Sequence, residues 1–495
     1  MGIIQRQGIR NTLITYTGII VGFVNLIIIQ PRYLTPEELG LTRILFSFSA
    51  LIATVLPLGI HQITLRYFPY FRDPSNKHSG YFGFMLLFPV IGFLLVSTVI
   101  VLLKNTITGL YIEKSKLFIE YFDYVFPMML SLGLTQVFTT YSSSLFRTTV
   151  PSFINDILVR VFSIGVVSLY FIRLVSLNQF IFLFVMIYVL QCILLLFYIL
   201  VIDRPKLRID KEKFSRENLP AMLRFGLLMA VASLSALGLK YLDVVMLGAL
   251  ANSNEALALA GIYSVAVFIP ALIDVPLTAL DRITYPKIAD AWAKNNLVEI
   301  KEIYVKSSRY LFLFGGLLFL GINLNTDSLM TFLPTGYSAG SSVIFIVSIS
   351  SLFNLLTGVN DSILHNSSKW MYSFYMLLIL FASALVLNIL LIPMYGMNGA
   401  ALATAISLFM FNAMKFFFIR KYFSLQPLDV KTLKTLFAII ITGLAVYFIP
   451  PIFSPVVDII LRSVLITSVY TAIIYFMKIA PELEPVAKAY LKKIF

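Results

Sequence analysis

A few charged side chains occur inside the long apolar stretches of this chain, and their types and spacing could support chemistry. Lys240 and Asp243 lie three residues apart, close enough on a helix for the ammonium and the carboxylate to neutralise each other. A lysine can also contact phosphate, and a buried carboxylate can bind a cation or a proton. The pair therefore indicates either a salt bridge between helices or an anion contact beside a coupling acid.

Two further charge positions leave the same alternatives open. Asp156 and Arg160 are four residues apart, with the acid first, which favours a local helical ion pair. Arg160 is nevertheless a candidate cation for a cavity. Asp274 stands alone among apolar residues between two prolines, and irregular backbone inside a membrane is tolerated where it lines a cavity. Asp274 is therefore a candidate titrating group, with a structural pair to Arg224 as the alternative.

The remaining polar candidates are weaker. Asp361 and Asn360 are polar enough to line a path, as are Asn11 and Asn25. Buried amides in membrane bundles usually hydrogen-bond between helices, so a structural role is the expectation for the asparagines. Arg43 lies near a helix end, where its side chain can reach the membrane surface. It remains a candidate for contacting phosphate at the outer mouth of a path.

The elements that hold these charges are predicted to be membrane spans. Hydrophobic residues make up 59% of the 495 residues, only 13% are charged, and the mean hydropathy is +0.90. Such a composition suits a polytopic membrane protein, whose helices each need about 20 apolar residues to cross a bilayer. The sequence predicts an all-α integral membrane protein with about fourteen transmembrane helices, at 11–30, 43–65, 81–103, 121–141, 153–172, 178–202, 221–250, 257–280, 309–330, 340–364, 371–392, 398–419, 434–452 and 456–477.

Two short segments indicate that the chain contains a repeat. Pro69 precedes Asp73 by four residues at the end of the second span, and Pro286 precedes Asp290 in the same way after the eighth. A second correspondence pairs Gly40-Leu41-Thr42-Arg43 with Gly261-Ile262-Tyr263-Ser264. Halves that both begin inside and contain six spans are parallel repeats about an axis along the membrane normal. Asp73 and Asp290 are predicted to make helix-end or gate contacts.

The repeat and a polar stretch define the expected domains. Six spans form one bundle, a charged connector closes with a proline, six spans form a second bundle, and two spans have no counterpart in the repeat. The predicted boundaries are 1–202 for the N-terminal six-helix bundle, 203–220 for the cytoplasmic connector, 221–421 for the C-terminal six-helix bundle, and 422–495 for two additional helices and a cytoplasmic tail.

Basic residues favour one set of alternate loops, which predicts orientation and excludes several classes of protein. The bias places both termini in the cytoplasm and accounts for most of the +14 net charge. Because these charges are spread over short loops, nucleic-acid binding is not expected. Cys192 is the only cysteine and the three histidines lack metal-ligand spacing, so no metal site is predicted. No phosphate-binding glycine loop appears, and no cofactor is expected.

Several longer segments carry a family resemblance. Residues 32–40 resemble the first outer loop of polysaccharide and oligosaccharide exporters, and 239–248 with 261–264 resemble their seventh helix and the loop that follows. Residues 388–401 are similar to the turn between their eleventh and twelfth helices. These matches span nearly the whole chain. They indicate the superfamily of multidrug exporters, lipid-linked oligosaccharide flippases and peptidoglycan-precursor flippases, and favour the polysaccharide branch.

The resemblance implies a flippase, not an enzyme, in the bacterial cell (inner) membrane. It would move a polyprenyl-pyrophosphate oligosaccharide from the cytoplasmic to the outer leaflet by alternating access, with ion or proton coupling as a hypothesis. Membrane lipids and glycan polymerase machinery are the expected partners. The candidate residues are Lys240, Arg160 and Arg43 as substrate-binding cations, and Asp243, Asp274 and Asp361 as coupling acids.

Three alternatives remain open on the sequence. A cation-coupled multidrug exporter on the same fold would have a more acidic and aromatic cavity, with less need for Lys240 and Arg160. A peptidoglycan-precursor flippase would share the fold and a lipid pyrophosphate. A membrane-embedded glycan polymerase or ligase would need a large outer loop, and the predicted outer loops are short.

Overall fold

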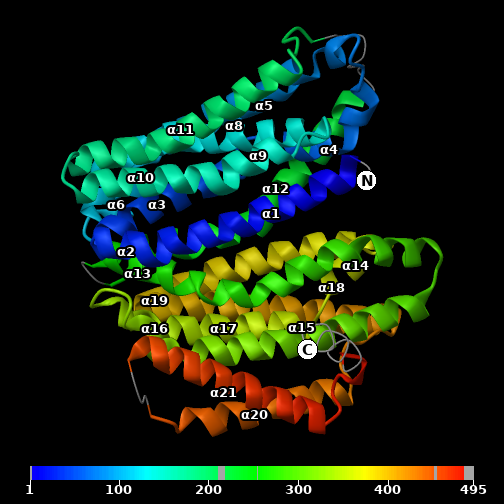
Figure 1. Ribbon diagram of the computed structural model, residues 1–495. Helices are drawn as coiled ribbons and strands as arrows, with labels where there is room; N and C mark the ends of the chain where they lie inside the picture. The colour runs from blue at the N-terminus through cyan, green and yellow to red at the C-terminus, as the bar shows by residue number, and fades with distance from the viewer. Residues whose placement is uncertain (1–2, 210–217, 253–254, 451–453, 484–495) are drawn as a thin grey trace. The chain divides into compact units, whose positions relative to one another are not determined.

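The protein is helical throughout the part of the chain that the structure describes. The computed structural model describes residues 3–209, 218–252, 255–450 and 454–483, and these contain helices and turns without a strand (Figure 1). Part of the predicted connector and the end of the predicted tail lie outside the described residues. The all-α prediction is confirmed.

The number of helices long enough to cross a membrane agrees with the predicted number of spans. Eleven helices of the described residues meet length and apolarity criteria for crossing a bilayer. One of them, α19 (Met371–Phe423), bends at Gly396, whose φ of 55° is outside the helical region, and so provides two crossings. The second and fourth predicted spans correspond to α3 with α4 and to α8, which fall outside that set of eleven. The prediction of about fourteen spans is consistent with this arrangement.

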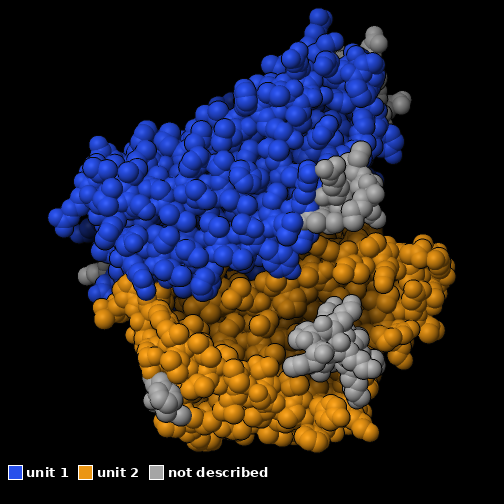
Figure 2. Space-filling view, viewed as in Figure 1, with its two compact units in different colours: residues 1–264, 392–397 blue, residues 265–391, 398–495 orange. Residues whose placement is uncertain are grey.

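The chain folds as two compact units, shown in different colours in Figure 2. Unit 1 comprises residues 1–264 and 392–397, and unit 2 comprises 265–391 and 398–495. Within unit 1, the helix that follows the predicted connector, α12, packs against α3 and α4. The domain boundaries predicted from the sequence stay a prediction.

Unit 1 is built on a core of aromatic and aliphatic side chains from α4, α5, α8 and α11. Phe68, Tyr81, Phe82 and Tyr141 pack with ring centroids 5.0–5.6 Å apart, an arrangement that favours tilted and edge-on contacts. The helices of unit 1 are α1 (Ile3–Phe23), α2 (Gln30–Tyr33), α3 (Pro36–Ala53), α4 (Ile60–Phe71), α5 (Tyr81–Leu102), α6 (Lys104–Tyr111), α7 (Lys116–Glu120), α8 (Val125–Ser144), α9 (Thr149–Phe153), α10 (Val159–Phe171), α11 (Leu177–Ile202), α12 (Asn218–Leu250) and the first part of α13 (Ala256–Phe268).

Unit 2 has a separate core in which α15 packs against α17, α20 and α21. Tyr470 is buried in this core, and its hydroxyl donates a 2.9 Å hydrogen bond to the carbonyl of Leu313. The helices of unit 2 are the end of α13, a 3₁₀ turn η5 (Pro270–Asp274), α14 (Val275–Ala293), α15 (Leu297–Asn323), α16 (Thr326–Met330), α17 (Ser341–Leu356), α18 (Asn360–Asn366), most of α19, α20 (Val430–Tyr447) and α21 (Pro455–Phe476).

The predicted repeat has a structural counterpart in two broken spans. The second span consists of α3 and α4, separated by a turn that includes Gly59, whose φ is 76°. The eighth consists of α13 and α14, separated by η5. Pro69 lies inside α4, close to its end, and Pro286 lies in the second half of α14. Discontinuous helices of this kind are common where transporters place polar groups at membrane depth.

The two aspartates of the repeat make local contacts at helix ends. Asp73 Oδ1 accepts hydrogen bonds from the backbone N–H of Ser75 at 3.1 Å and of Asn76 at 3.3 Å. Asp290 forms a 2.6 Å ion pair with Lys294, one turn later and exposed to solvent. The expectation that these residues make helix-end contacts is confirmed.

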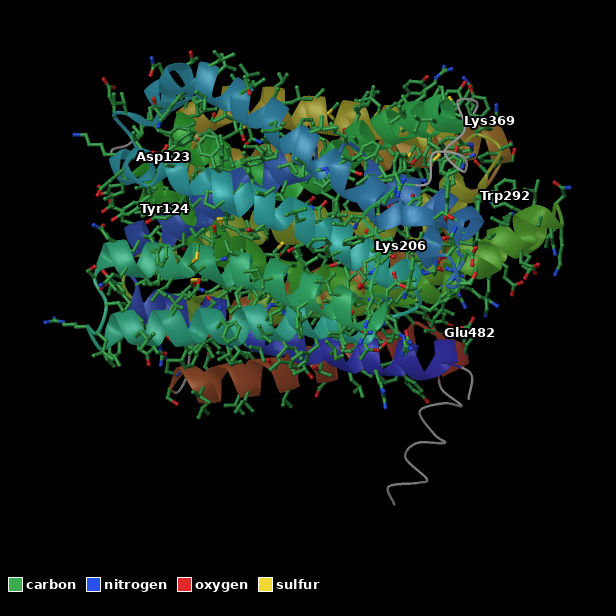
Figure 3. All side chains as sticks on the ribbon, turned by 90° about the horizontal axis from the view of Figure 1, so that it is seen from above. Asp123, Tyr124, Lys206, Trp292, Lys369 and Glu482 are labelled. Carbon is green, nitrogen blue, oxygen red and sulfur yellow. The ribbon has the colours of Figure 1, made fainter. Side chains whose placement is uncertain are left out.

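The labelled residues in Figure 3 show which loops of each unit share an end. In unit 1, Asp123 and Lys206 lie at opposite ends. In unit 2, Trp292, Lys369 and Glu482 lie at the same end. Figure 3 therefore agrees with helices that alternate in direction through each unit.

Candidate functional site

A hydrogen-bonded cluster inside unit 1 holds Arg43, one of the predicted cations, and Arg160 lies on the same helix as another member of the cluster, Ser163. An Arg43 Nη2–H donates to Gln30 Oε1, and Gln30 Nε2 lies 3.3 Å from Asn25 Oδ1 and 3.2 Å from Ser163 Oγ. Asn25 Nδ2 is also 3.2 Å from Ser163 Oγ. We call Arg43, Gln30, Asn25, Ser163 and Arg160 the arginine cluster. Gln30 and Asn25 are buried, and Arg43 is half-buried.

Arg160 lies against α1 at two glycines, where α1 has no side chains to exclude the guanidinium. A Cβ atom placed on Gly18 would lie 2.8 Å from Arg160 Nη1, and one on Gly22 would lie 3.0 Å from Arg160 Nε. Glycines four residues apart allow helices to approach closely inside a membrane. Asp156 attracts Arg160 electrostatically and also accepts a hydrogen bond from Thr15. The predicted attraction between Asp156 and Arg160 is therefore present, but no ion pair within 4.0 Å joins them in the part of the chain that the structure describes.

Two π-helical turns position the polar groups of the arginine cluster. Residues Val24–Ile29 form one such turn and contain Asn25, and Ile154–Leu158 form the other and contain Asp156. A π-helical turn inserts an extra residue into a helix and often occurs at functional sites, because it turns a side chain out of the regular helical face. Since α1 packs against the second turn, both irregularities meet in one region of unit 1.

Aromatic rings line the same region. The positive charges of Arg43 and Arg160 both interact with the hydroxyl of Tyr188. The ring of Phe46 packs 5.2 Å from that of Tyr188 and 5.8 Å from that of Tyr241, measured between centroids. The region thus combines two guanidinium groups, amide and hydroxyl groups, and flat ring faces.

The pair of charges on α12 is separated by the structure. Asp243 is buried and accepts a 2.5 Å hydrogen bond from the hydroxyl of Tyr263. Lys240 is exposed, and within the described residues no ion pair joins it to Asp243. The alternative in which Lys240 and Asp243 neutralise each other is therefore not observed.

Unit 2 holds Asp274 in a network of neutral side chains. Ser351 Oγ donates to Asp274 Oδ2 at 2.7 Å, and Asn354 Nδ2 donates to Asp274 Oδ1 at 3.1 Å. Asn412 Nδ2 in turn donates to Asn354 Oδ1 at 3.2 Å, and Thr357 Oγ1 lies 3.4 Å from Asn412 Oδ1. We call these five residues the amide network. No cationic side chain described in unit 2 lies within ion-pair distance of Asp274.

A lysine that the sequence analysis did not single out neutralises Asp361. Lys415 Nζ lies 3.0 Å from both carboxylate oxygens of Asp361, and its side chain is only 1% exposed. The ammonium also lies 3.9 Å from the ring centroid of Phe411. Asp281, which accepts a 2.9 Å hydrogen bond from Ser362, adds its negative charge nearby. This group of charges therefore has two acids and one buried base.

The structure brings some predicted residues together and adds residues that sequence reasoning missed. Asn25 hydrogen-bonds to Ser163 of α10, as predicted for buried amides, and Asn11 to Thr148, the residue before α9. Lys415 could have been found as a lysine inside a predicted apolar span. The other missed residues are common polar types without a distinctive spacing: Gln30, Ser163, Ser351, Asn354, Thr357 and Asn412.

Comparison with a protein-family model decides the family. The model described as "Polysaccharide biosynthesis protein" matches residues 4–292, more than half of the chain. The chain belongs to this family. The family match and the helical fold confirm the resemblance seen in the sequence.

Two curated proteins with similar sequences come from archaea. An uncharacterized membrane protein of Methanocaldococcus jannaschii is 21% identical over 444 residues, which is 85% of each chain. A probable flippase, AglR, of Haloferax volcanii is 28% identical over 184 residues, which is 36% of this chain and 37% of the relative.

Two solved structures with the same fold are a flippase and a multidrug transporter. The lipid II flippase MurJ in an inward closed conformation has a TM-score of 0.74, with 15% identity, and the match covers 95% of this chain and all of that one. An inward-facing multidrug resistance transporter of the MATE family has a TM-score of 0.62, also at 15% identity, covering 84% of this chain and 94% of that one. At this identity the likeness shows the fold alone.

Proposed function

We propose that this protein flips a lipid-linked oligosaccharide, carried on a polyprenyl pyrophosphate, from the cytoplasmic to the outer leaflet of the cell membrane. The observation that carries the proposal is the arginine cluster. Two guanidinium groups lie among the membrane-spanning helices of unit 1, and because charges inside a membrane are costly, they are functional candidates by default. The family and the flippase-named archaeal relative support the same activity.

The chemistry of the arginine cluster suits a phosphate-bearing head group. Guanidinium groups bind phosphate through two parallel hydrogen bonds, which fixes the orientation of the anion as well as attracting it. Arg43 and Arg160 would contact the pyrophosphate, with the exposed Lys240 as a third cation. The rings of Tyr188, Phe46 and Tyr241 offer flat faces on which sugar rings can stack.

Transport would proceed by alternating access, coupled to an ion or proton gradient. Asp243, Asp274 and Asp361 are the proposed coupling acids. Asp243 is buried and accepts a hydrogen bond from Tyr263. The described hydrogen-bond partners of Asp274 are both neutral side chains. Asp361 is already paired with Lys415, so its coupling role would require that pair to open. We further propose that both termini lie in the cytoplasm, and that glycan polymerase machinery receives the product.

The decisive experiment measures flipping by the purified protein in liposomes. The probe is a fluorescent oligosaccharide linked to a short polyprenyl pyrophosphate, and its accessibility to a membrane-impermeant quencher reports the leaflet. We expect the wild type to equalise the leaflets, and Arg43→Gln and Arg160→Gln to slow flipping by about tenfold or more, because a charged hydrogen bond contributes roughly 1.5–3 kcal/mol.

Matched variants and substrates separate the alternatives. Arg32→Gln removes an exposed arginine of α2 and should flip the probe at the wild-type rate. A probe with the same sugar on an uncharged lipid should not discriminate between wild type and Arg43→Gln. Wild-type liposomes that leave the pyrophosphate probe in place but expel a cationic dye would contradict the proposal and support the multidrug alternative.

A further inference from the structure

We infer that Gln30 is a positioning residue for Arg43, and that the π-helical turn Val24–Ile29 holds Gln30 in the orientation this requires. The inference deepens the proposed function and rests on it, because it takes Arg43 as a group that contacts the anionic head group. It identifies an uncharged side chain that sets the affinity for pyrophosphate through the arginine beside it.

The side-chain amide of Gln30 has only one orientation that suits its neighbours. Its Nε2 atom lies 3.3 Å from Asn25 Oδ1 and 3.2 Å from Ser163 Oγ, so both N–H bonds of the amide have acceptors. Its Oε1 atom accepts a hydrogen bond from Arg43 Nη2. The reversed amide would place N–H groups against the guanidinium, which has no acceptor. Donors and acceptors therefore match in one arrangement.

The π-helical turn explains how Asn25 can support Gln30. The two residues are five positions apart, and on a regular α-helix their side chains would point about 140° away from each other around the axis. Here the backbone N–H of Gln30 donates to the carbonyl of Asn25, which is the five-residue spacing of a π-helix. The wider turn brings both side chains to the same face of the helix.

The groups that support Arg43 are buried and bonded to one another. Gln30, Asn25 and Ser163 are 3%, 6% and 8% exposed, whereas Arg43 is half-buried. Asn25 Nδ2 also donates to Ser163 Oγ at 3.2 Å. A buried network of this kind resists rearrangement, because breaking one bond leaves its partner unsatisfied away from water. Gln30 is therefore a fixed acceptor for the guanidinium.

The backbone that carries Arg43 is fixed as well. α3 begins with a capping box, in which Thr35 Oγ1 accepts a 3.2 Å hydrogen bond from the N–H of Glu38, and Glu38 Oε2 accepts a 2.9 Å hydrogen bond from the N–H of Thr35. Arg43 follows on the same helix, and its far end is bonded to Gln30 of α2. The long side chain is thus held at both ends.

Holding the guanidinium in advance raises its affinity for an anion. A long side chain loses rotamer freedom when it binds a ligand, and preorganisation removes that loss. The guanidinium fork also bonds phosphate in a parallel pair only when its plane is turned toward the anion. An apolar residue in place of Gln30 should therefore weaken pyrophosphate binding, but only while Arg43 is present.

The test combines two substitutions and measures binding of inorganic pyrophosphate. Purified full-length protein in detergent is titrated with pyrophosphate by calorimetry, and flipping of the fluorescent probe is followed in liposomes. We expect Gln30→Met to weaken pyrophosphate binding by about tenfold, as for the loss of a hydrogen bond to a charged group. Adding Gln30→Met to Arg43→Gln should cause no further loss, because Gln30 acts through Arg43. Arg160 is kept throughout so that binding stays measurable.

Gln191→Met is the matched control for the loss of a buried amide. Gln191 on α11 is 6% exposed and, like Gln30, donates from Nε2 to an asparagine, here Asn155 Oδ1 at 2.7 Å. It lies outside the arginine cluster, so Gln191→Met should bind pyrophosphate with wild-type affinity. Thermal unfolding of both variants reports the cost of the lost amide to the fold separately from its effect on binding.

Ser163→Ala is a milder variant that serves if Gln30→Met does not fold. It removes one acceptor of the Gln30 amide and leaves the other, Asn25, in place. It should weaken pyrophosphate binding by about threefold, within the range for one neutral hydrogen bond, and again only when Arg43 is present.

The outcomes separate this inference from the proposed function. Equal losses from Gln30→Met with and without Arg43 would overturn the inference, because a purely structural role is additive. An equal loss of affinity in Gln191→Met, or a wild type that binds no pyrophosphate, would overturn it too. Pyrophosphate binding that depends on Gln30 through Arg43, in a protein that flips no probe, would refute the proposed function and leave the positioning of Arg43 standing.

Discussion

The polar interiors of unit 1 and unit 2 differ in the groups that surround their charges. In unit 1, Arg43 donates to the amide oxygen of Gln30, Asp156 attracts Arg160, and the buried Asp243 accepts a hydrogen bond from Tyr263. In unit 2, the buried bases Lys415 and Arg309 are paired with Asp361 and Asp429, while Asp274 accepts hydrogen bonds from Ser351 and Asn354. Under the proposed function, the guanidinium groups of unit 1 would meet the anionic head group, and the acids of unit 2 would serve coupling.

The largest expected effect concerns Lys415, a buried base of unit 2. Asp361→Asn leaves the 1%-exposed Lys415 without its closest counter-charge, and an unpaired buried charge costs about 3 kcal/mol or more. Lys415→Met should cost less, because the Asp361 side chain is 47% exposed and can be hydrated. Thermal unfolding of the purified variants measures both. The double variant Asp361→Asn/Lys415→Met should regain most of the stability that Asp361→Asn loses. Equal losses of stability in all three variants would contradict the assignment of Asp361 as the counter-charge of Lys415.

The next largest effect is expected for Gly40→Ala, which tests how closely two helices of unit 1 approach each other. A Cβ atom on Gly40 would lie 1.7 Å from the carbonyl oxygen of Leu257, so Gly40→Ala must separate α3 from α13. Overpacking of this kind costs about 1–3 kcal/mol. Gly165→Ala is the control, because a Cβ there meets no atom within 4 Å. In that helix alanine should leave Tm unchanged or raise it, since alanine favours helix over glycine by up to about 1 kcal/mol.

A third variant tests the role of Arg160 in flipping without removing its charge. Gly22→Val places a branched side chain where the Arg160 guanidinium lies, because even a Cβ there would be 3.0–3.1 Å from its Nε and Cζ atoms. We expect flipping of the pyrophosphate probe to fall by roughly tenfold, as for a loss of about 1.4 kcal/mol of binding. Gly321→Val, on an open face of α15 in unit 2, should retain the wild-type rate. Unchanged flipping by Gly22→Val would argue against a role for Arg160.

The smallest effect concerns an acid of unit 1 outside the membrane spans. Burial alone would raise the pKa of Asp203, but hydrogen bonds with His78 and Tyr141 and the charge of Lys77 outweigh it and lower the pKa below its ordinary value. A lowered folded-state pKa stabilises the fold above the unfolded value of about 3.9. That contribution disappears as the pH falls through the folded-state pKa.

The corresponding variant is Asp203→Asn. It should cost roughly 1 kcal/mol at pH 7, a typical figure for lost hydrogen bonds, and the difference from wild type should shrink only below about pH 4. Unfolding curves recorded at several pH values provide the measurement. Asp123→Asn alters an exposed acid paired with Lys104 and should show no such dependence. A difference that persists unchanged at pH 3 would show that Asp203 acts through packing alone.

The sequence predicted the fold well because membrane spans are determined by local composition. About 20 apolar residues must form a helix in lipid whatever their neighbours, so the number of spans and the repeat followed from the chain alone. The repeat also identified Pro69 and Pro286 at equivalent places in α4 and α14. None of these features depends on which helices become neighbours.

Contacts between side chains could be predicted only where both partners lie on one helix. The spacing of Asp156 and Arg160 indicated their attraction, but nothing in the sequence placed Gly18 and Gly22 beneath that arginine. Spacing also suggested that Lys240 and Asp243 pair, whereas a tyrosine from the next helix binds Asp243 instead. Tertiary packing decides such competition, and a single sequence does not record it.

One contact in unit 1 joins the two copies of the repeat, at Gly40 and Gly261. Gly40 approaches Leu257, four residues before Gly261, and Gly261 approaches Pro36, four residues before Gly40, so the two equivalent glycines meet reciprocally. Reciprocal contact between equivalent residues is the mark of a two-fold axis, as in a symmetric dimer. A side chain at either glycine would therefore press on the backbone of the other segment, so the crossing of α3 and α13 tolerates a Cβ on neither side.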